Sequence, residues 1–185
     1  MRVLETELPG VKIIEPRVFP DARGFFLETF HAERYARFGI PGQDAAFVQD
    51  NHSRSVHRVV RGLHFQRRNP QGKLVYVVRG RIWDVAVDIR PSSPTFRRWV
   101  AVELSENDHR QLWIPPGYAH GFCVLSELAD VIYKTTALYD PADDAGIRWD
   151  DPDLAIDWPV QDPILSEKDR KLPRLAELAP DRLPA

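Results

Sequence analysis

The chain has 185 residues, a length that suits one domain with a substantial core better than two. With 43% hydrophobic and 28% charged residues, its composition is that of a globular protein. Because 25 basic residues stand against 27 acidic ones, for a net charge of −2, the bulk charge gives no support for nucleic-acid or membrane-surface binding.

Cysteine content and hydropathy indicate in which cellular compartment the protein is expected. The only cysteine is Cys123, so no intramolecular disulfide can form, which fits a reducing environment. The first ten residues, MRVLETELPG, lack the apolar centre of a signal peptide, and no run of about 18 apolar residues occurs. We therefore expect a soluble, cytoplasmic protein.

Short apolar or alternating segments, separated by Gly, Pro and Asp, follow one another along the chain. Segments of this kind, rich in β-branched and aromatic residues, are typical of a β-sandwich or β-barrel. The expected strands are residues 24–30, 47–51, 59–66, 73–78, 82–89, 96–104, 110–115, 120–125 and 130–139. The sequence thus predicts a mainly β fold.

Turns and helices are few. Gly80–Arg81, between two strong strands, predicts a tight hairpin. A short helix is expected over residues 31–38, ending before Gly39, and a second over residues 166–171 with Ser166 as its N-cap. The last dozen residues, rich in Pro, Leu and charge, predict a surface tail.

Two histidines stand in patterned surroundings, His64 in RGLHFQ and His120 in IPPGYAHGF. Together they resemble the two half-motifs of the cupin barrel, a double-stranded jelly roll. Gln66 and Val124 occupy positions where that motif usually places a second histidine and an asparagine. A catalytic metal needs about three protein ligands, so we expect neither metal nor cofactor and leave the histidines free for acid–base chemistry.

Seven segments, in order and at the expected spacing, carry a more specific resemblance. They are residues 19–30, 47–55, 60–66, 71–96, 113–126, 133–139 and 165–169. Over roughly residues 10–175 the chain resembles the dTDP-4-dehydrorhamnose 3,5-epimerases of rhamnose biosynthesis. The resemblance implies one cupin domain over residues 1–185, with N-terminal strands exchanged in a homodimer and a short C-terminal helix and tail. It also implies a dTDP-sugar substrate and pathway neighbours that are a dehydratase and a reductase.

The implied reaction inverts C3 and C5 beside a C4 ketone, through an enolate. It requires a base on one face of the sugar, a stabiliser of the oxyanion and a proton donor on the other face. By resemblance, His64 is the base, Asp169 orients it, Lys73 stabilises the enolate oxygen and Tyr133 donates the proton.

Each of these residues also has a structural interpretation. His64 can be a hydrogen-bonded strand histidine, and Asp169 stands three residues after Ser166, as in a capping box. Lys73 can lie in water at a sheet edge. Tyr133 can be a core residue with its hydroxyl satisfied.

Further positions match those that contact the nucleotide or the sugar in the family. They are Arg23, Glu28, Gln49, Asn51, Arg61, His120, Tyr139, Asp144 and Lys168. Arg61 would hold the diphosphate, since its planar fork suits phosphate oxygens. Tyr139 would stack on the thymine, whereas Arg23 and Glu28 would complete the site of the partner subunit.

The spacing of Arg61 and His64 creates a geometric difficulty. Side chains three residues apart on a regular strand face opposite sides of the sheet. Both can reach one ligand only if Gly62 marks a bulge or the phosphates pass over the strand end.

Departures from the family pattern keep other functions open. Asp144 stands where the family commonly has Glu, and Arg97 replaces a frequent glycine. Related enzymes that invert only C3 or only C5 keep much the same residues. A metal-dependent cupin enzyme and a non-catalytic sugar-binding cupin are the remaining alternatives.

Overall fold

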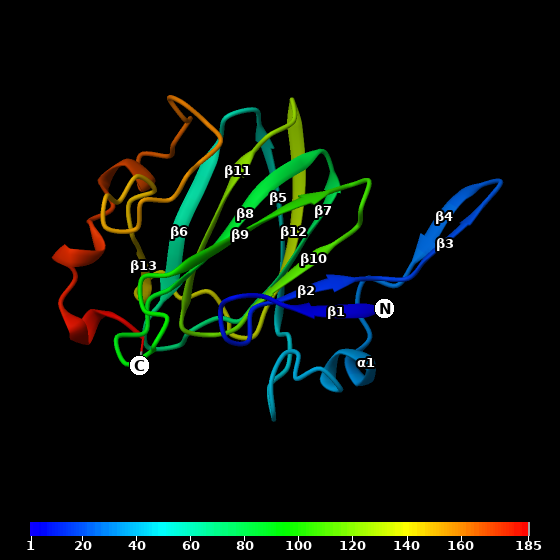
Figure 1. Ribbon diagram of the computed structural model, residues 1–185, viewed down its shortest axis with the longest axis horizontal. Coiled ribbons are helices and arrows are strands. Elements are labelled where there is room, and N and C mark those ends of the chain that lie inside the picture. The colour runs from blue at the N-terminus through cyan, green and yellow to red at the C-terminus, as the bar shows by residue number, and fades with distance from the viewer. Residues whose placement is uncertain (185) are drawn as a thin grey trace.

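The computed structural model describes residues 1–184 and consists mainly of antiparallel strands in two facing sheets (Figure 1). The six-stranded sheet is formed, in spatial order, by β1 (Arg2–Glu5), β2 (Lys12–Glu15), β10 (Gln111–Ile114), β7 (Lys73–Arg79), β12 (Leu128–Thr135) and β5 (Gln49–Val56). The five-stranded sheet is formed by β13 (Asp144–Gly146), β6 (Val60–Gln66), β11 (Tyr118–Val124), β8 (Arg81–Asp88) and β9 (Trp99–Ser105). This is the predicted jelly-roll architecture.

An apolar core fills part of the space between the two sheets. Val75 and Val77 of β7 and Val131 of β12 meet Ala86 of β8 and Phe122 of β11, and all five side chains are buried. Because successive residues of a strand face opposite sides, the alternating hydrophobic pattern seen in the sequence places one residue in two in this core. Many of the inward positions that are polar lie together elsewhere and form the site described below.

The turn at Gly80–Arg81 corrects one prediction. β7 and β8 lie in different sheets, so this turn is not a hairpin but the passage of the chain from one sheet to the other. Gly80 has a φ of +79°, and a Cβ there would lie 2.0 Å from the carbonyl oxygen of Leu128, so only glycine fits. The prediction of a tight turn was correct, but the prediction that the two flanking strands pair with each other was wrong.

All nine predicted strand segments overlap observed strands, whereas β1, β2, β3 and β13 were missed. Three of the four are short segments within the first 21 residues. The remaining one, β13, has the sequence Asp-Ala-Gly, which is poor in strand-forming residues. It forms because it pairs with the edge of β6, an interaction that local sequence does not encode.

The helices are shorter than predicted. The first, α1, spans Ala32–Ala36, and Gly39 follows with a φ of +73°. The second is a single 3-10 turn, η1 (Asp169–Lys171). Two further 3-10 turns, η2 (Leu175–Glu177) and η3 (Pro180–Arg182), lie in the stretch predicted to be a surface tail.

That tail prediction is wrong in part. Leu175 and Leu183 are buried in an apolar cluster with Leu63, Phe65 and Val85 of the five-stranded sheet. Their leucine spacing allows the C-terminal segment to cover the outer face of this sheet (Figure 1). Burial of two leucines is enough to fix a segment that is otherwise polar.

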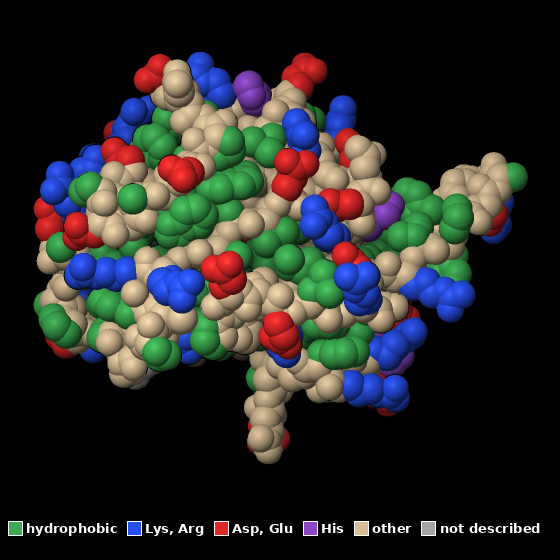
Figure 2. All heavy atoms as spheres, in the orientation of Figure 1, with side chains coloured by type: hydrophobic (Ala, Val, Ile, Leu, Met, Phe, Trp, Pro, Cys, Tyr) green, Lys and Arg blue, Asp and Glu red, His purple; other side chains and the backbone are tan. Residues whose placement is uncertain are grey.

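A two-stranded hairpin projects from the body of the molecule (Figure 1). Its strands are β3 (Val18–Asp21) and β4 (Gly24–Leu27). Hydrophobic side chains lie along this projection (Figure 2), and Phe26 is 68% exposed. None of the helices among residues 1–184 is long and apolar enough to cross a membrane.

Candidate active site

A cavity of about 380 Å³ opens between the two sheets. Ten of the residues selected from the sequence line it: Gln49, Asn51, Arg61, His64, Lys73, His120, Tyr133, Tyr139, Asp144 and Lys168. They come from six strands of both sheets and from two loop segments, which carry Tyr139 and Lys168. The fold therefore assembles one polar pocket from positions spread over about 120 residues of sequence.

His64 forms a hydrogen-bonded pair with Asp169. The distance between His64 Nε2 and Asp169 Oδ1 is 2.6 Å, and Asp169 is only 4% exposed. Burial alone would raise the pKa of this carboxyl, but the hydrogen bond and the charge of His64, helped by Ser166 and Lys168, lower it on balance. The carboxylate is thus ionised, and it fixes the orientation of the imidazole.

The capping interpretation of Asp169 is also correct in part. The backbone N–H of Asp169 donates to Ser166 Oγ at 3.0 Å. This bond shapes the turn that leads into η1 and places the carboxylate of Asp169 beside β6. The local cap and the contact with His64 therefore coexist.

A bulge in β6 resolves the difficulty with Arg61 and His64. On the neighbouring strand β11, His120 lies opposite His64 and Phe122 lies opposite Arg61. Three positions of β6 therefore match two of β11, so β6 carries one extra residue at this point. Because of the extra residue, the side chains of Arg61 and His64 face the same side of the sheet, and both line the cavity.

Gly62 makes this bulge sterically possible. It has a φ of +114°, a backbone conformation that side chains with a Cβ rarely adopt. A Cβ at this position would also lie 2.6 Å from the Cα of Gly121 and 2.6 Å from the carbonyl oxygen of His120. The glycine therefore permits both the close approach of the strands and the alignment of the two side chains.

Lys73, the first residue of β7, points into the cavity rather than into water. It is 7% exposed, and within residues 1–184 its Nζ makes one long hydrogen bond, of 3.5 Å, to the carbonyl oxygen of His64. Burial lowers the pKa of Lys73 to about 8, although Asp144 and Asp84 oppose that shift. Its ammonium keeps donors free for a ligand.

Tyr133 lies on β12, in the sheet opposite His64, so the phenol and the imidazole approach the cavity from opposing walls. Burial raises the pKa of the Tyr133 hydroxyl, and the positive charge of Arg61 partly offsets this. The phenol is therefore protonated at neutral pH and can donate a proton.

Side chains at the mouth of the cavity form a connected network. Asp144 Oδ2 accepts a hydrogen bond of 2.9 Å from the Tyr139 hydroxyl and forms an ion pair with Lys168. The Tyr139 backbone N–H donates to Gln49 Oε1, and Gln49 Nε2 donates to Asn51 Oδ1, both at 2.9 Å. The network orders the exposed ring of Tyr139, which suits it for stacking on a planar ligand group.

Three of the residues selected from the sequence do not line this cavity: Asp169 lies behind His64, whereas Arg23 and Glu28 contact none of its lining residues through the hydrogen bonds and ion pairs they make. Arg23, in the turn of the projecting hairpin, pairs with Asp21, and Glu28, just after β4, pairs with Arg34 at 2.7 Å. Neither reaches the pocket of its own chain. The prediction that they complete the site of a partner subunit remains a prediction.

Several contributors to the pocket were not predicted from the sequence. Asp84, fully buried on β8, pairs with His120 Nε2 at 2.8 Å. Ser55 Oγ accepts a hydrogen bond from Arg61 Nε at 2.9 Å, and Ser53 adds a further hydroxyl to the cavity wall. For Asp84 a signal existed, since a carboxylate inside the apolar run IWDVAVDI is costly to bury without a partner.

The side chains around the cavity also bear on whether it could bind a metal ion. Among residues 1–184, no three or more His, Cys, Asp and Glu side chains are grouped so that they could hold a metal ion. The Gln66 amide nitrogen donates to the carbonyl oxygens of Asn69 and Leu138, and its Oε1 accepts from the backbone of Asp140. This side chain is therefore committed to holding loops rather than to ligating an ion.

Taken together, the pocket joins an oriented imidazole, a protonated phenol and a buried ammonium on a jelly-roll scaffold. These are the elements of an acid–base enzyme of the cupin class that acts on an anionic, sugar-sized substrate.

Comparison with known proteins identifies the family. The family model described as dTDP-4-dehydrorhamnose 3,5-epimerase matches residues 5–177, and the chain belongs to this family. The dTDP-4-dehydrorhamnose 3,5-epimerase of Escherichia coli (strain K12) is 53% identical over 180 residues, which cover 96% of each chain. A relative from Streptomyces niveus named dTDP-4-dehydrorhamnose 3-epimerase is 40% identical over 178 residues, which cover 96% of this chain and 85% of that one.

The fold agrees with solved structures of the family. A crystal structure of dTDP-6-deoxy-D-glucose-3,5-epimerase from Legionella pneumophila, in complex with dTDP-4-keto-L-rhamnose, superposes with a TM-score of 0.95. The two chains are 49% identical, and the match covers 99% of this chain and 97% of the Legionella chain. The cupin-type fold expected from the sequence is thereby confirmed.

Proposed function

We propose that the protein is a dTDP-4-dehydrorhamnose 3,5-epimerase that converts dTDP-4-dehydro-6-deoxy-α-D-glucose into dTDP-4-dehydro-β-L-rhamnose. Family membership and the sugar nucleotide in the Legionella structure support this substrate. The observation that carries the proposal is the arrangement of the pocket, in which the His64–Asp169 pair and Tyr133 lie on opposing walls with the Lys73 ammonium in the same cavity.

The first step is proton abstraction from a carbon beside the C4 ketone. His64 is the base, and the ionised carboxylate of Asp169 fixes its tautomer and stabilises the imidazolium that forms. The C–H electron pair moves toward the carbonyl oxygen, so that an enolate develops. No electrons are gained or lost overall, and side chains alone can carry the chemistry.

Lys73 stabilises the developing oxyanion. Its ammonium is buried and makes only one long hydrogen bond within the described chain, so it can donate to the oxygen of the ketone. In a cavity of low polarity, such a donor is worth more than it would be in water. His120 lines the same cavity from the opposite, five-stranded sheet and contacts the sugar there.

Reprotonation from the other face completes the inversion. Tyr133 approaches from the sheet opposite His64, and its phenol is protonated because burial raises its pKa. One inversion moves a proton from carbon to His64 and another from Tyr133 to carbon. Both side chains must then exchange with solvent before the second carbon is inverted, so hydrogen from water enters the product.

The nucleotide occupies the mouth of the cavity. Arg61 binds the diphosphate, because its guanidinium is held by Ser55 and still presents further donors. Tyr139 stacks on the thymine, and Lys168 exchanges its contact with Asp144 for phosphate oxygens. Gln49 and Asn51 contribute hydrogen bonds from β5.

A homodimer completes the site in this proposal. The projecting hairpin exposes aromatic side chains, and neither Arg23 in its turn nor Glu28 just after β4 lines the pocket of its own chain. Exchange of this hairpin between subunits would bury the aromatic surface and bring both residues to the partner's nucleotide. Mixing inactive His64→Ala and Arg23→Ala homodimers and restoring exchange should recover activity, because one site of each mixed dimer is intact.

Heavy water provides the decisive test of the reaction. The 4-keto sugar nucleotide is incubated with the protein in D₂O, and deuterium at C3 and C5 is measured by NMR and mass spectrometry. Label at both carbons supports double epimerisation. Label at C3 alone places the chain with the Streptomyces niveus 3-epimerase, and label at neither carbon eliminates epimerisation. Loss of activity with a chelator, restored by iron or manganese, would instead favour a metal-dependent cupin enzyme.

A further inference from the structure

Strand β8 carries two buried aspartates, Asp84 and Asp88, which stand four residues apart and so point to the same side of the sheet. Both are fully buried, with 0% exposure. A carboxylate that is removed from water needs hydrogen bonds or a positive charge in place of its lost hydration. The two aspartates differ in how far this need is met.

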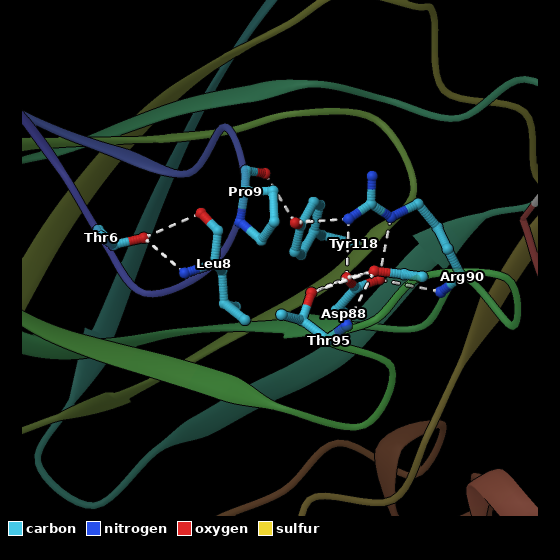
Figure 3. Close-up of polar contacts among 8 residues, drawn as sticks. Thr6, Leu8, Pro9, Asp88, Arg90, Thr95 and Tyr118 are labelled. Atoms are coloured by element: carbon cyan, nitrogen blue, oxygen red, sulfur yellow. Dashed lines mark hydrogen bonds and ion pairs between the residues drawn. The ribbon is translucent and has the colours of Figure 1, made fainter.

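Asp88 is fully compensated. Its carboxylate accepts hydrogen bonds of 2.6–2.9 Å from three side chains: Arg90, Ser93 and Thr95 (Figure 3). Burial opposes ionisation, but these bonds lower the pKa of Asp88 to about 2. Arg90 also donates to the hydroxyl of Tyr118, which in turn donates to the carbonyl oxygen of Pro9. This network fastens the N-terminal segment to the barrel and is structural.

Asp84 is not compensated in this way. Its Oδ1 is 2.8 Å from His120 Nε2, but its buried Oδ2 has no hydrogen-bond partner among residues 1–184. Unpaired buried carboxylate oxygens are rare in folded proteins, because they are costly for stability. The position is therefore explained better by the chemistry of the neighbouring site than by the stability of the fold.

The neighbouring charged group is Lys73. Asp84 is one of two acids that favour its charged form, the other being Asp144, whereas Lys168 opposes it. His64 and His120 line the same cavity. Lys73 Nζ has spare donors, and Asp84 Oδ2 has spare acceptor capacity, so the two groups attract each other without consuming the donors that a substrate needs.

We infer that Asp84 is a positioning residue of the active site, which fixes His120 with Nε2 as the donor and gives the pocket that holds Lys73 a buried negative charge. This inference rests on the proposed function. With Nε2 bound to Asp84, the Nδ1 of His120 is the ring atom left for the sugar. The Asp84 carboxylate thus orients His120 and favours the charged form of Lys73.

The test compares Asp84→Asn with Asp88→Asn, two isosteric changes on one strand. Asp84→Asn should keep the fold and lower kcat/KM by about 10²-fold, as expected when an acid–base site loses an orienting carboxylate. Without the Asp84 charge the pKa of Lys73 should fall further, so the alkaline limb of kcat/KM should move to lower pH. Asp88→Asn should lower Tm and leave kcat/KM of the folded protein within about threefold of the parent.

A parent-like kcat/KM and alkaline limb in Asp84→Asn would overturn the inference, and so would a loss of activity with no shift of that limb. A second readout needs neither substrate nor variant. In the ligand-free parent, ring ¹⁵N shifts of His120 should report a protonated Nε2, and a protonated Nδ1 with bare Nε2 would refute the assignment. Failure of the parent to exchange deuterium, with His120 in the expected form, would count against the proposed function instead.

Discussion

Replacing Lys73 with methionine should stabilise the folded protein while removing its activity. The side chain is 7% exposed, and burial lowers its pKa from 10.5 to about 8. The folded protein therefore binds the Lys73 proton less tightly than the unfolded chain does. This difference between the two pKa values corresponds to about 3 kcal/mol of destabilisation wherever the lysine is charged in both states.

The size of this effect depends on pH. Below about pH 8 the full penalty is present, because Lys73 is protonated in both states. As pH rises from 8 toward 10.5, the folded protein loses the proton first, the unfolded chain holds it, and the penalty shrinks to below about 1 kcal/mol at pH 10. The stability gain of Lys73→Met should therefore be large at pH 7 and small at pH 10.

Urea unfolding at both pH values measures this difference. Lys134→Met is a matched control, because Lys134 lies on the neighbouring strand β12 and pairs with the exposed Asp50 at 2.9 Å. It should change the free energy of unfolding by less than about 1 kcal/mol at either pH. A Lys73→Met protein that is less stable than the parent at pH 7, or equally shifted at both pH values, would refute the reasoning.

Three other changes probe the site. His64→Ala should lower turnover by about 10²–10⁴-fold, since the group that abstracts the proton is gone, and a steady-state assay within about tenfold of the parent would contradict the role. Tyr133→Phe should reduce formation of inverted product more than it reduces exchange of C–H with D₂O; equal losses in both NMR measurements would mark the tyrosine as structural. Gly62→Ala should lower the free energy of unfolding by about 1–3 kcal/mol in chemical denaturation and weaken activity. The added Cβ would meet the backbone of Gly121, so the bulge would have to shift. A fully active, equally stable variant would show that the bulge tolerates a side chain.

The strands were predictable because burial on one face leaves an alternating trace in the sequence. Segment 73–78 is instead a nearly continuous apolar run, because the first three residues of β7 (Lys73–Arg79) are buried on both faces of the sheet. Pairing between strands is not encoded locally, so the passage at Gly80 was taken for a hairpin although β7 and β8 lie in different sheets. Likewise, β13 forms only because the edge of β6 is available to it.

Site residues were predictable where they sit in ordered motifs, as His64 and His120 do. The resemblance also selected Asp169, which lies 105 residues from its partner His64 and has no local feature beyond a capping position. Asp84 was missed because segment 82–89 was read as an apolar run. No hydrogen-bonding partner was therefore predicted for the carboxylate within it. Rules about buried charges would have found it, although they would not have named His120 as that partner.

The two-sheet architecture itself suits an inversion. An epimerase must remove a proton from one face of a carbon and deliver another to the opposite face, so its base and its acid cannot share a wall. In this chain His64 belongs to the five-stranded sheet, whereas Tyr133 and Lys73 belong to the six-stranded sheet. A planar enolate held between the sheets would then meet the imidazole on one side and the phenol on the other. The bulge at Gly62 adds Arg61 to the wall that carries His64. In the proposed function, a diphosphate bound there would anchor the sugar without occupying either face.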